Sequence, residues 1–191
     1  DYYEQALAIA REIGHRQGEG NHLGNLGLAY SDLGQVERAI DYYEQALAIA
    51  REVGHRQGEG AHLGNLGLAY RDLGQVERAI EYYEQALAIA REVGHRQGEG
   101  SHLSNLGSAY FNLKDYTRAA DYYRLRLQIS QEIGHRYGEA NGLWGLAICA
   151  EAAGNMAEAI AQAQAALEIF EAIKSPSAET MRKMLERWQE G

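Results

Sequence analysis

Between residues 15 and 54, apolar and small residues recur at helical spacing in two successive stripes. The first stripe consists of Leu23, Leu26, Gly27 and Tyr30, an i, i+3, i+4, i+7 pattern that occupies one face of a helix. The second consists of Ala39, Tyr43, Ala46, Leu47 and Ala50. Between them, Asp32-Leu33-Gly34-Gln35 interrupts the pattern, and Gly34 suits a left-handed helix C-cap. The pattern therefore predicts two helices joined by a tight turn, an antiparallel hairpin.

The hairpin pattern recurs every 40 residues along the chain. Residues 41–80 repeat residues 1–40 with three changes: Ile13 becomes Val53, Asn21 becomes Ala61 and Ser31 becomes Arg71. Later segments keep the pattern and drift in sequence. Such a period indicates a stack of one supersecondary unit, in which each hairpin completes the core of its neighbour. The near identity fits an artificial consensus or a recent duplication, and the later drift favours duplication.

The repeat sets the expected organisation of the chain. We predict the second helix of a truncated repeat at 1–14, four repeats at 15–54, 55–94, 95–134 and 135–174, and a C-terminal capping helix at 175–191. Ser175-Pro176 provides an N-cap with Pro at the first helical position. The apolar face of the capping helix would consist of Met181, Met184, Leu185 and Trp188. The truncated first repeat has no comparable lid, so we expect its apolar edge to be exposed.

The order of small and aromatic residues resembles the tetratricopeptide repeat (TPR) signature. In the first repeat the matching residues are Leu23, Leu26, Gly27, Tyr30, Ala39, Tyr43 and Ala46. Repeats of this family usually contain 34 residues. The 40-residue variant is similar to the long-helix repeats of Pins/LGN-type G-protein-signalling modulators and of bacterial multidomain signalling proteins. The resemblance implies an all-α, right-handed α-solenoid of stacked antiparallel helix hairpins, the TPR superhelix.

Composition and charge narrow the classes of partner. The chain carries 18 Lys and Arg against 27 Asp and Glu, a net charge of −9, which disfavours binding to phosphate backbones of nucleic acids. No run of 18 apolar residues is present, so we expect no membrane span. The single cysteine, Cys149, cannot form an internal disulfide and fits a reducing compartment. We therefore expect a cytoplasmic protein.

Neither a metal site nor an active site is expected. His15 and His22 are seven residues apart, about 10 Å along a helix, which is too far for them to share one ion without other ligands. The glycine-rich GEGNHLGNLG has no preceding strand and no following Lys-Ser/Thr, so it does not match a phosphate-binding loop. No nucleophile, base and orienting group stand out together. We predict a non-enzyme without metal or cofactor.

Three asparagines, Asn25, Asn65 and Asn105, are the main candidate binding residues. Each lies beside the core Leu-Gly, on the helix face that lines the concave side of such superhelices. An Asn amide offers one acceptor and two donors, which matches a peptide group. We predict that this column holds the backbone of an extended peptide. The alternative is that each amide bonds the neighbouring hairpin.

Specificity is expected where the repeats diverge around this column. The candidate groove residues are Asn21, Ser31, Arg71, Phe111 and Trp144. Trp144 and Phe111 would form an aromatic patch near the C-terminal part of the groove, because aromatic residues in clefts are frequent anchors. Alternatively, Trp144 plugs the groove or packs on Ile148.

Protein–protein interaction is thus the expected function, with a peptide or a partner helix in the concave groove. A structural spacer or self-assembling scaffold is the alternative, since the exposed edge of 1–14 would allow an isologous homodimer. A further alternative is the sensor array of a larger signalling ATPase, protease or kinase.

Overall fold

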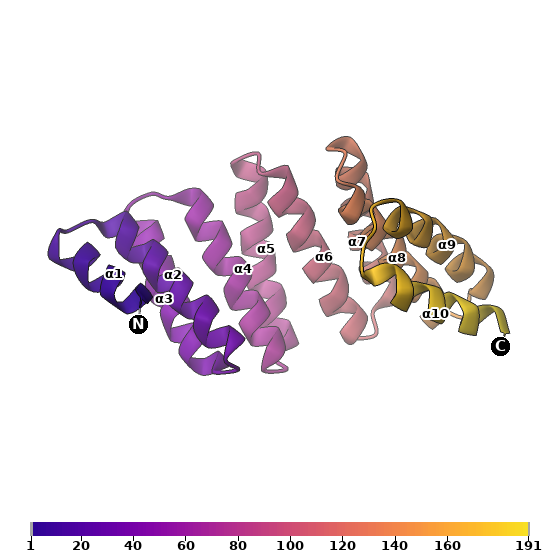
Figure 1. Ribbon diagram of the computed structural model, residues 1–191, viewed down its shortest axis with the longest axis horizontal. Helices are drawn as coiled ribbons and strands as arrows, with labels where there is room; N and C mark the ends of the chain where they lie inside the picture. Colours follow the sequence, from indigo (N-terminus) through magenta and orange to yellow (C-terminus); the bar gives the residue numbers. More distant parts are fainter. Residues whose placement is uncertain (1, 191) are drawn as a thin grey trace. The chain divides into compact units, whose positions relative to one another are not determined.

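The computed structural model describes residues 2–190, and this range contains ten α-helices and no strand (Figure 1). The helices are α1 (Tyr2–Glu12), α2 (Arg16–Asp32), α3 (Val36–Glu52), α4 (Arg56–Asp72), α5 (Val76–Glu92), α6 (Arg96–Asn112), α7 (Tyr116–Glu132), α8 (Arg136–Ala152), α9 (Met156–Ala172) and α10 (Ser177–Glu190). The predicted all-α class, with stacked antiparallel helix hairpins, is confirmed.

The chain divides into two compact units, Asp1–His95 and Arg96–Gly191. The first contains α1 to α5 and the second α6 to α10. Inside each unit the helices pack in chain order (Figure 1), as hairpins α2/α3 and α4/α5 in the first and α6/α7 and α8/α9 in the second. Neighbouring hairpins meet through α3 with α4, and through α7 with α8. Each predicted repeat thus contains two of the observed helices.

Gly34 ends α2 in the way that its sequence context predicts. Its φ angle is 70°, in the left-handed region where glycine carries no Cβ penalty. The amide of Gln35 donates to the carbonyl of Tyr30 at 2.9 Å, and that of Gly34 to Ser31 at 2.9 Å, so two terminal carbonyls of the helix are satisfied. Lys114 adopts the same conformation in the third repeat, with φ 61°.

Glycines inside the first helices allow the two helices of a hairpin to approach closely. A Cβ at Gly27 would lie 2.5 Å from Cε1 of Tyr43, and this tyrosine is 2% exposed. The same pairing recurs between Gly67 and Tyr83, again at 2.5 Å. The tyrosine ring of the second helix therefore fills the space that a side chain on the first helix would take. This close approach explains why glycine occurs inside the first helices although it lowers helix stability.

Helix α10 packs on α9 and closes the second unit as a capping helix would. Leu185 is buried, and Met181 and Trp188 pack against buried residues of α8 and α9. The helix begins at Ser177, later than expected from Ser175-Pro176. Ser175 still serves the helix start, because its Oγ accepts a hydrogen bond from the Ser177 amide at 3.2 Å.

Candidate functional site

The first helices of the hairpins carry the candidate asparagines. Asn25 lies on α2, Asn65 on α4 and Asn105 on α6, each next to a buried leucine and half-buried itself. None of the three side chains forms a hydrogen bond with a described residue. In the first unit α2 and α4 are in contact, but the Asn25 side chain forms no hydrogen bond with the neighbouring hairpin. Its amide donors and its carbonyl acceptor are therefore open to a ligand.

A buried histidine joins α2 to α4 beside these asparagines. The His62 ring lies against Gly24, where a Cβ would come 2.6 Å from its Cε1. Burial lowers the pKa of His62 to about 4, with a smaller contribution from His55, so the ring is neutral at pH 7. Asn21 is exposed and lines the same closed seam between the hairpins. Gly24 on α2 therefore leaves room for the imidazole ring of His62 on α4.

Two candidate specificity residues lie at the C-terminal ends of the first helices in the first unit. Ser31 and Arg71 occupy equivalent positions on α2 and α4, and both are half-buried. Arg71 Nη2 donates to Oδ1 of Asp72 at 2.8 Å, which partly neutralises its charge. Both side chains keep surface that a ligand can reach.

In the second unit the two candidate aromatic residues have separate partners. Phe111 packs at a tilt against Tyr116, with ring centroids 5.2 Å apart. Trp144 stacks on Trp188 of the capping helix, with centroids 5.6 Å apart. Each of the two rings thus has another aromatic partner, and their role as an aromatic patch of the groove stays a prediction. Phe111 remains a groove candidate.

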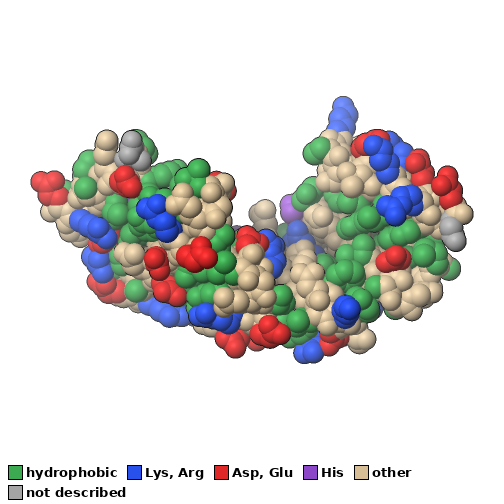
Figure 2. All heavy atoms as spheres, turned by 90° about the horizontal axis from the view of Figure 1, so that it is seen from below, with side chains coloured by type: hydrophobic (Ala, Val, Ile, Leu, Met, Phe, Trp, Pro, Cys, Tyr) green, Lys and Arg blue, Asp and Glu red, His purple; other side chains and the backbone are tan. Residues whose placement is uncertain are grey.

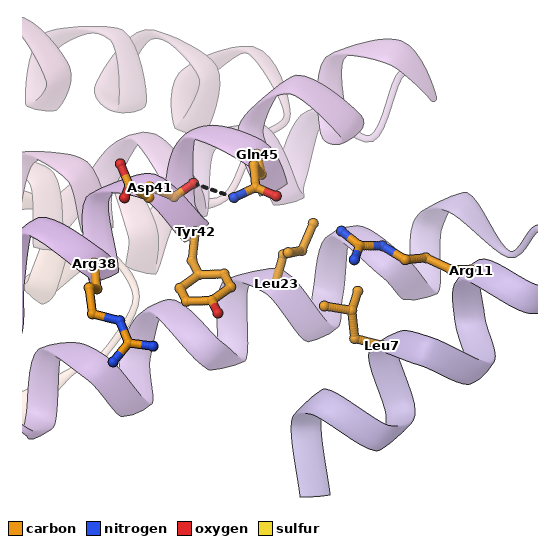
Figure 3. Close-up of a pocket in the computed structure, with 7 residues that line it drawn as sticks. All are labelled: Leu7, Arg11, Leu23, Arg38, Asp41, Tyr42 and Gln45. Carbon is orange, nitrogen blue, oxygen red and sulfur yellow. Dashed lines mark hydrogen bonds between the residues drawn. The ribbon is translucent and has the colours of Figure 1, made fainter. Parts of the chain in front are cut away.

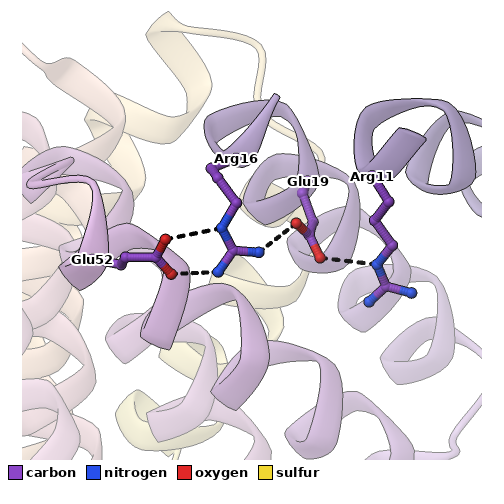
Figure 4. A network of polar contacts seen from close by, with 4 residues as sticks. All are labelled: Arg11, Arg16, Glu19 and Glu52. Carbon is purple, nitrogen blue, oxygen red and sulfur yellow. Dashed lines mark hydrogen bonds and ion pairs between the residues drawn. The ribbon is translucent and has the colours of Figure 1, made fainter. Parts of the chain in front are cut away.

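A chain of ion pairs runs between neighbouring helices of the first unit (Figure 4). Glu19, 7% exposed, accepts from Nε of Arg11 at 2.9 Å and from Nη1 of Arg16 at 2.5 Å. Arg16 Nε in turn donates to Glu52 at 3.0 Å. The hydrogen bond from Arg11 holds the pKa of Glu19 below its usual range, against the effect of burial, and Arg16 adds to the lowering. The network ties three helices together, and its sequence signal is the 40-residue recurrence of these charges.

Shallow pockets lie between successive second helices of the first unit. One of about 320 Å³ lies between α1 and α3 (Figure 3). It is lined by Leu7, Arg11, Leu23, Arg38, Asp41, Tyr42 and Gln45. A second, of about 380 Å³, lies between α3 and α5 and includes the equivalent Leu47, Arg51 and Tyr82. These pockets combine an arginine, a tyrosine and an amide, so they offer binding contacts.

Arg126 is a buried charge that interrupts the core of the second unit. It stands where the first unit has Ala46 and Ala86, it is 5% exposed, and its Nε and Nη1 atoms are enclosed without a hydrogen-bond partner. Its guanidinium lies against Gly100 of α6 and Gly138 of α8. The repeat alignment marks Arg126 as a departure, but the extent of its burial depends on both neighbouring helices.

No three His, Cys, Asp or Glu side chains within residues 2–190 are arranged to hold a metal ion. Over the same range, none of the helices combines the length and apolar character needed to cross a membrane.

On the face drawn in Figure 2, acidic and basic side chains are interspersed, with hydrophobic side chains between them. This face of the molecule therefore offers both polar and apolar contacts.

Comparison with family models identifies one match, described as Tetratricopeptide repeat, at residues 1–52, 21–92, 58–132 and 98–172. A search of curated proteins returned no match. The narrower resemblance to the Pins/LGN type stays a prediction.

Several solved structures share the fold. BtubC (BKLC) from P. vanneervenii is 26% identical with a TM-score of 0.83, over 90% of this chain and 72% of that chain. A putative kinesin light chain from Podosopora anserina with nearly identical TPR-like repeats is 22% identical, with a TM-score of 0.73 over 89% of this chain and 85% of that one. Aspartyl phosphate phosphatase F from Bacillus subtilis is 16% identical with a TM-score of 0.89, and the match covers 97% of this chain but only 49% of the phosphatase chain.

Proposed function

Because the chain belongs to the tetratricopeptide repeat family, we propose that it is a protein-interaction module that binds an extended peptide or a partner helix. The ligand would lie along the first helices of the hairpins, on α2 and α4 in the first unit. The observation that carries this proposal is the pair of half-buried amides of Asn25 and Asn65, neither of which has a hydrogen-bond partner among the described residues.

The chemistry of these amides suits a peptide backbone. Each amide can donate to a carbonyl and accept from an N–H of an extended chain. A half-buried position shields such bonds from water, which makes them stronger than exposed ones. Asn105 presents the same group on α6 of the second unit. Binding by backbone would be largely independent of ligand side chains, so selectivity falls to the residues around the amides.

Selectivity would come from the positions at which the repeats differ. Asn21 and Ser31 offer small polar contacts on α2, whereas Arg71 on α4 offers a cation for an acidic ligand group. Phe111 offers an apolar contact on α6. Trp144 is omitted from this set because it stacks on Trp188. The first unit would accordingly favour polar or acidic ligand side chains.

A random peptide library displayed on phage and selected against the full chain tests this proposal. Selected peptides should bind the Asn25→Ala/Asn65→Ala variant more than about tenfold more weakly, because two hydrogen bonds worth about 1 kcal/mol each are lost. Asn112→Ala, at the exposed end of α6, serves as the matched control and should bind normally. Circular dichroism checks that helicity is kept. Unchanged affinity in the double variant would reject the role of the amides.

Self-association is a second candidate, favoured by the exposed face of α1. Ile9 is 58% exposed, whereas the equivalent Ile49 is 5% exposed because it packs on Gly20 of α2. No described helix covers Ile9 in that way. An apolar helix face of this kind can pair with the same face of a second copy in a twofold dimer.

Sedimentation equilibrium over a wide concentration range distinguishes this candidate. Self-association through α1 predicts a mass that rises with concentration and falls to the monomer in Ile9→Glu. Ala8→Glu adds a charge at an exposed position of α1 that lies about 100° around the helix from Ile9, and it should leave the association intact. A monomer at all concentrations would exclude this candidate.

A further inference from the structure

The second unit contains an open surface cavity of about 240 Å³ between α7 and the turn that joins α8 to α9. Its apolar wall is formed by Leu146, Cys149 and three alanines, Ala120, Ala150 and Ala153. Its mouth carries Arg124 and Glu158, both exposed. None of these residues belongs to the surface proposed to bind a peptide through asparagines, so this cavity can be tested separately.

The 40-residue repeat identifies the side chains that occupy this position elsewhere. Ala120 corresponds to Ile40 and Ile80, Ala150 to Tyr30, Tyr70 and Tyr110, and Ala153 to Leu33, Leu73 and Leu113. Two of these positions are buried in the first unit, at Ile80 and Tyr70, whereas the leucine position is exposed, with Leu33 at 68%. Truncation of the two buried side chains leaves space unless the structure collapses around it or a ligand fills it.

The first unit shows how an aromatic ring is held at the equivalent position. Tyr70 is 5% exposed and stacks in parallel on Tyr82, with ring centroids 5.2 Å apart. The guanidinium of Arg78 lies 4.0 Å from the Tyr70 ring centroid. In the fourth repeat all three members of this stack are replaced: Tyr70 by Ala150, Tyr82 by Gln162 and Arg78 by Glu158.

The charges around the position are exchanged as well. Burial raises the pKa of Tyr70, and Tyr82 adds to the rise. Arg78 opposes it, and Glu44 makes a smaller raising contribution, which places Glu44 in the electrostatic surroundings of the phenol. The counterpart of Glu44 in the cavity is Arg124. Arg124 Nη1 donates to Asp121 at 2.7 Å, and its remaining nitrogens are available as donors. An arginine can donate to a phenol oxygen, as Arg38 does to Tyr30 at 2.7 Å.

We propose that this cavity is a docking site for one aromatic side chain of a protein partner, with a preference for tyrosine. The ring would fill the space left by Ala120, Ala150 and Ala153, and Arg124 would donate to its hydroxyl group. An enclosed apolar cavity of about 150 Å³ is sufficient to bind benzene; the space here is larger and open to solvent on one side, so a phenol ring fits with its hydroxyl edge toward the opening. The partner ring would restore the packing that Tyr30, Tyr70 and Tyr110 provide in the other hairpins.

The first experiment titrates p-cresol and N-acetyl-tyrosinamide into the full chain and follows amide chemical shifts by NMR. Both compounds should shift resonances of α7, α8 and α9. Cys149 is the single cysteine and lines the cavity, so its rate of reaction with a thiol reagent is a second readout, which p-cresol should slow. Toluene, which lacks the hydroxyl, should bind more weakly than p-cresol, and Arg124→Gln should remove this difference.

Ala150→Tyr restores the ring found in the other repeats and should weaken p-cresol binding more than about tenfold. Ala8→Tyr, at an exposed position of α1, is the matched control and should bind p-cresol like wild type. Ala120→Ile provides a second cavity-filling variant if Ala150→Tyr fails to fold. Equal binding of p-cresol by wild type and the filled variants would overturn the proposal. If p-cresol binds but N-acetyl-tyrosinamide does not, the cavity would be a site for free phenolic compounds. The proposal that it binds a side chain of a protein partner would then be overturned.

Discussion

The two units build the same hairpins from different side-chain contacts. In the first unit Glu59 accepts from Arg51 at 2.9 Å and also pairs with Arg56. In the second unit the equivalent Glu139 keeps one arginine, Arg136, at 2.5 Å, while a glutamine replaces the other. The helices nevertheless have the same length and order. The comparison teaches that these ion pairs are not required to specify the hairpin.

Burial at the contact between the two helices of a hairpin, by contrast, is kept in both units with different side chains. The first unit places Gly67 against Tyr83. In the fourth repeat the same two positions are Ala147 and Ala163, and both are buried. The first helix gains a methyl group where the second loses a ring, so the side chains of the pair occupy less volume in the fourth repeat. Both positions nevertheless stay buried, whereas the surface ion pairs differ between the units.

Two single substitutions at equivalent positions, Ala46→Arg and Arg126→Ala, should have the largest effects on stability. Ala46→Arg would bury a cation in a seam without free volume, and we expect a loss of about 3 kcal/mol or more, the typical cost of an uncompensated buried charge. Arg126→Ala removes such a charge from the second unit and should raise the free energy of unfolding by about 1–3 kcal/mol. Urea denaturation of each single variant measures both changes. A destabilised Arg126→Ala would show that the guanidinium is satisfied in the folded protein.

Acidification should destabilise the protein through His62 of the first unit, whose repeat counterparts in the second unit are His102 and Gly142. The pKa of His62 falls from 6.5 to about 4 on folding, so between these values the unfolded chain binds more protons. The free energy of unfolding should therefore decrease as pH falls from 6.5 to 4, by up to about 3 kcal/mol. His62→Asn should lose this part of the pH dependence in urea titrations at pH 7 and pH 4.5. Parallel curves for variant and wild type would contradict the burial of a neutral ring.

The smallest predicted effects concern the hydroxyl groups of two equivalent tyrosines. Their removal should change the stability of the protein in opposite directions. The Tyr83 hydroxyl is enclosed without a partner, whereas the Tyr123 hydroxyl shares a hydrogen bond with Ser108 at 3.0 Å. Tyr83→Phe should stabilise the protein by about 1 kcal/mol, because an unsatisfied buried group is removed. Tyr123→Phe should destabilise it by a similar amount. Thermal denaturation of both variants compares them directly, and equal signs would refute the assignment.

Much of the fold could be predicted from the sequence because its signals are local. The stripe of Leu23, Leu26 and Tyr30 predicts one helix, and Gly34 predicts its end, since both depend on residues within a few turns. The positions of Asn25 and Asn65 on first helices follow from the same periodicity. Their role in ligand binding stays a prediction.

Contacts between distant residues were the part that the sequence could not supply. For Trp144 the sequence left open an aromatic patch, a plug of the groove and packing on Ile148. Its stack on Trp188, 44 positions later, was not among these alternatives. The cavity at Ala150 could not be foreseen either, because a change from tyrosine to alanine predicts a void only if the neighbouring helices do not close around it. The burial of Arg126 likewise depends on α6 and α8 together.

The sequence by itself determined the hairpin and its repetition, because helical periodicity and turn glycines act over a few residues. The tertiary structure alone decided which side chains remain available. The exposure of Ile9 depends on which helices cover α1, and the Trp144 stack on the position of α10. The space beside Ala150 depends on the distance between α7 and α9. Each of these outcomes arises from packing between segments far apart in the chain, where the pattern of a single helix carries no information.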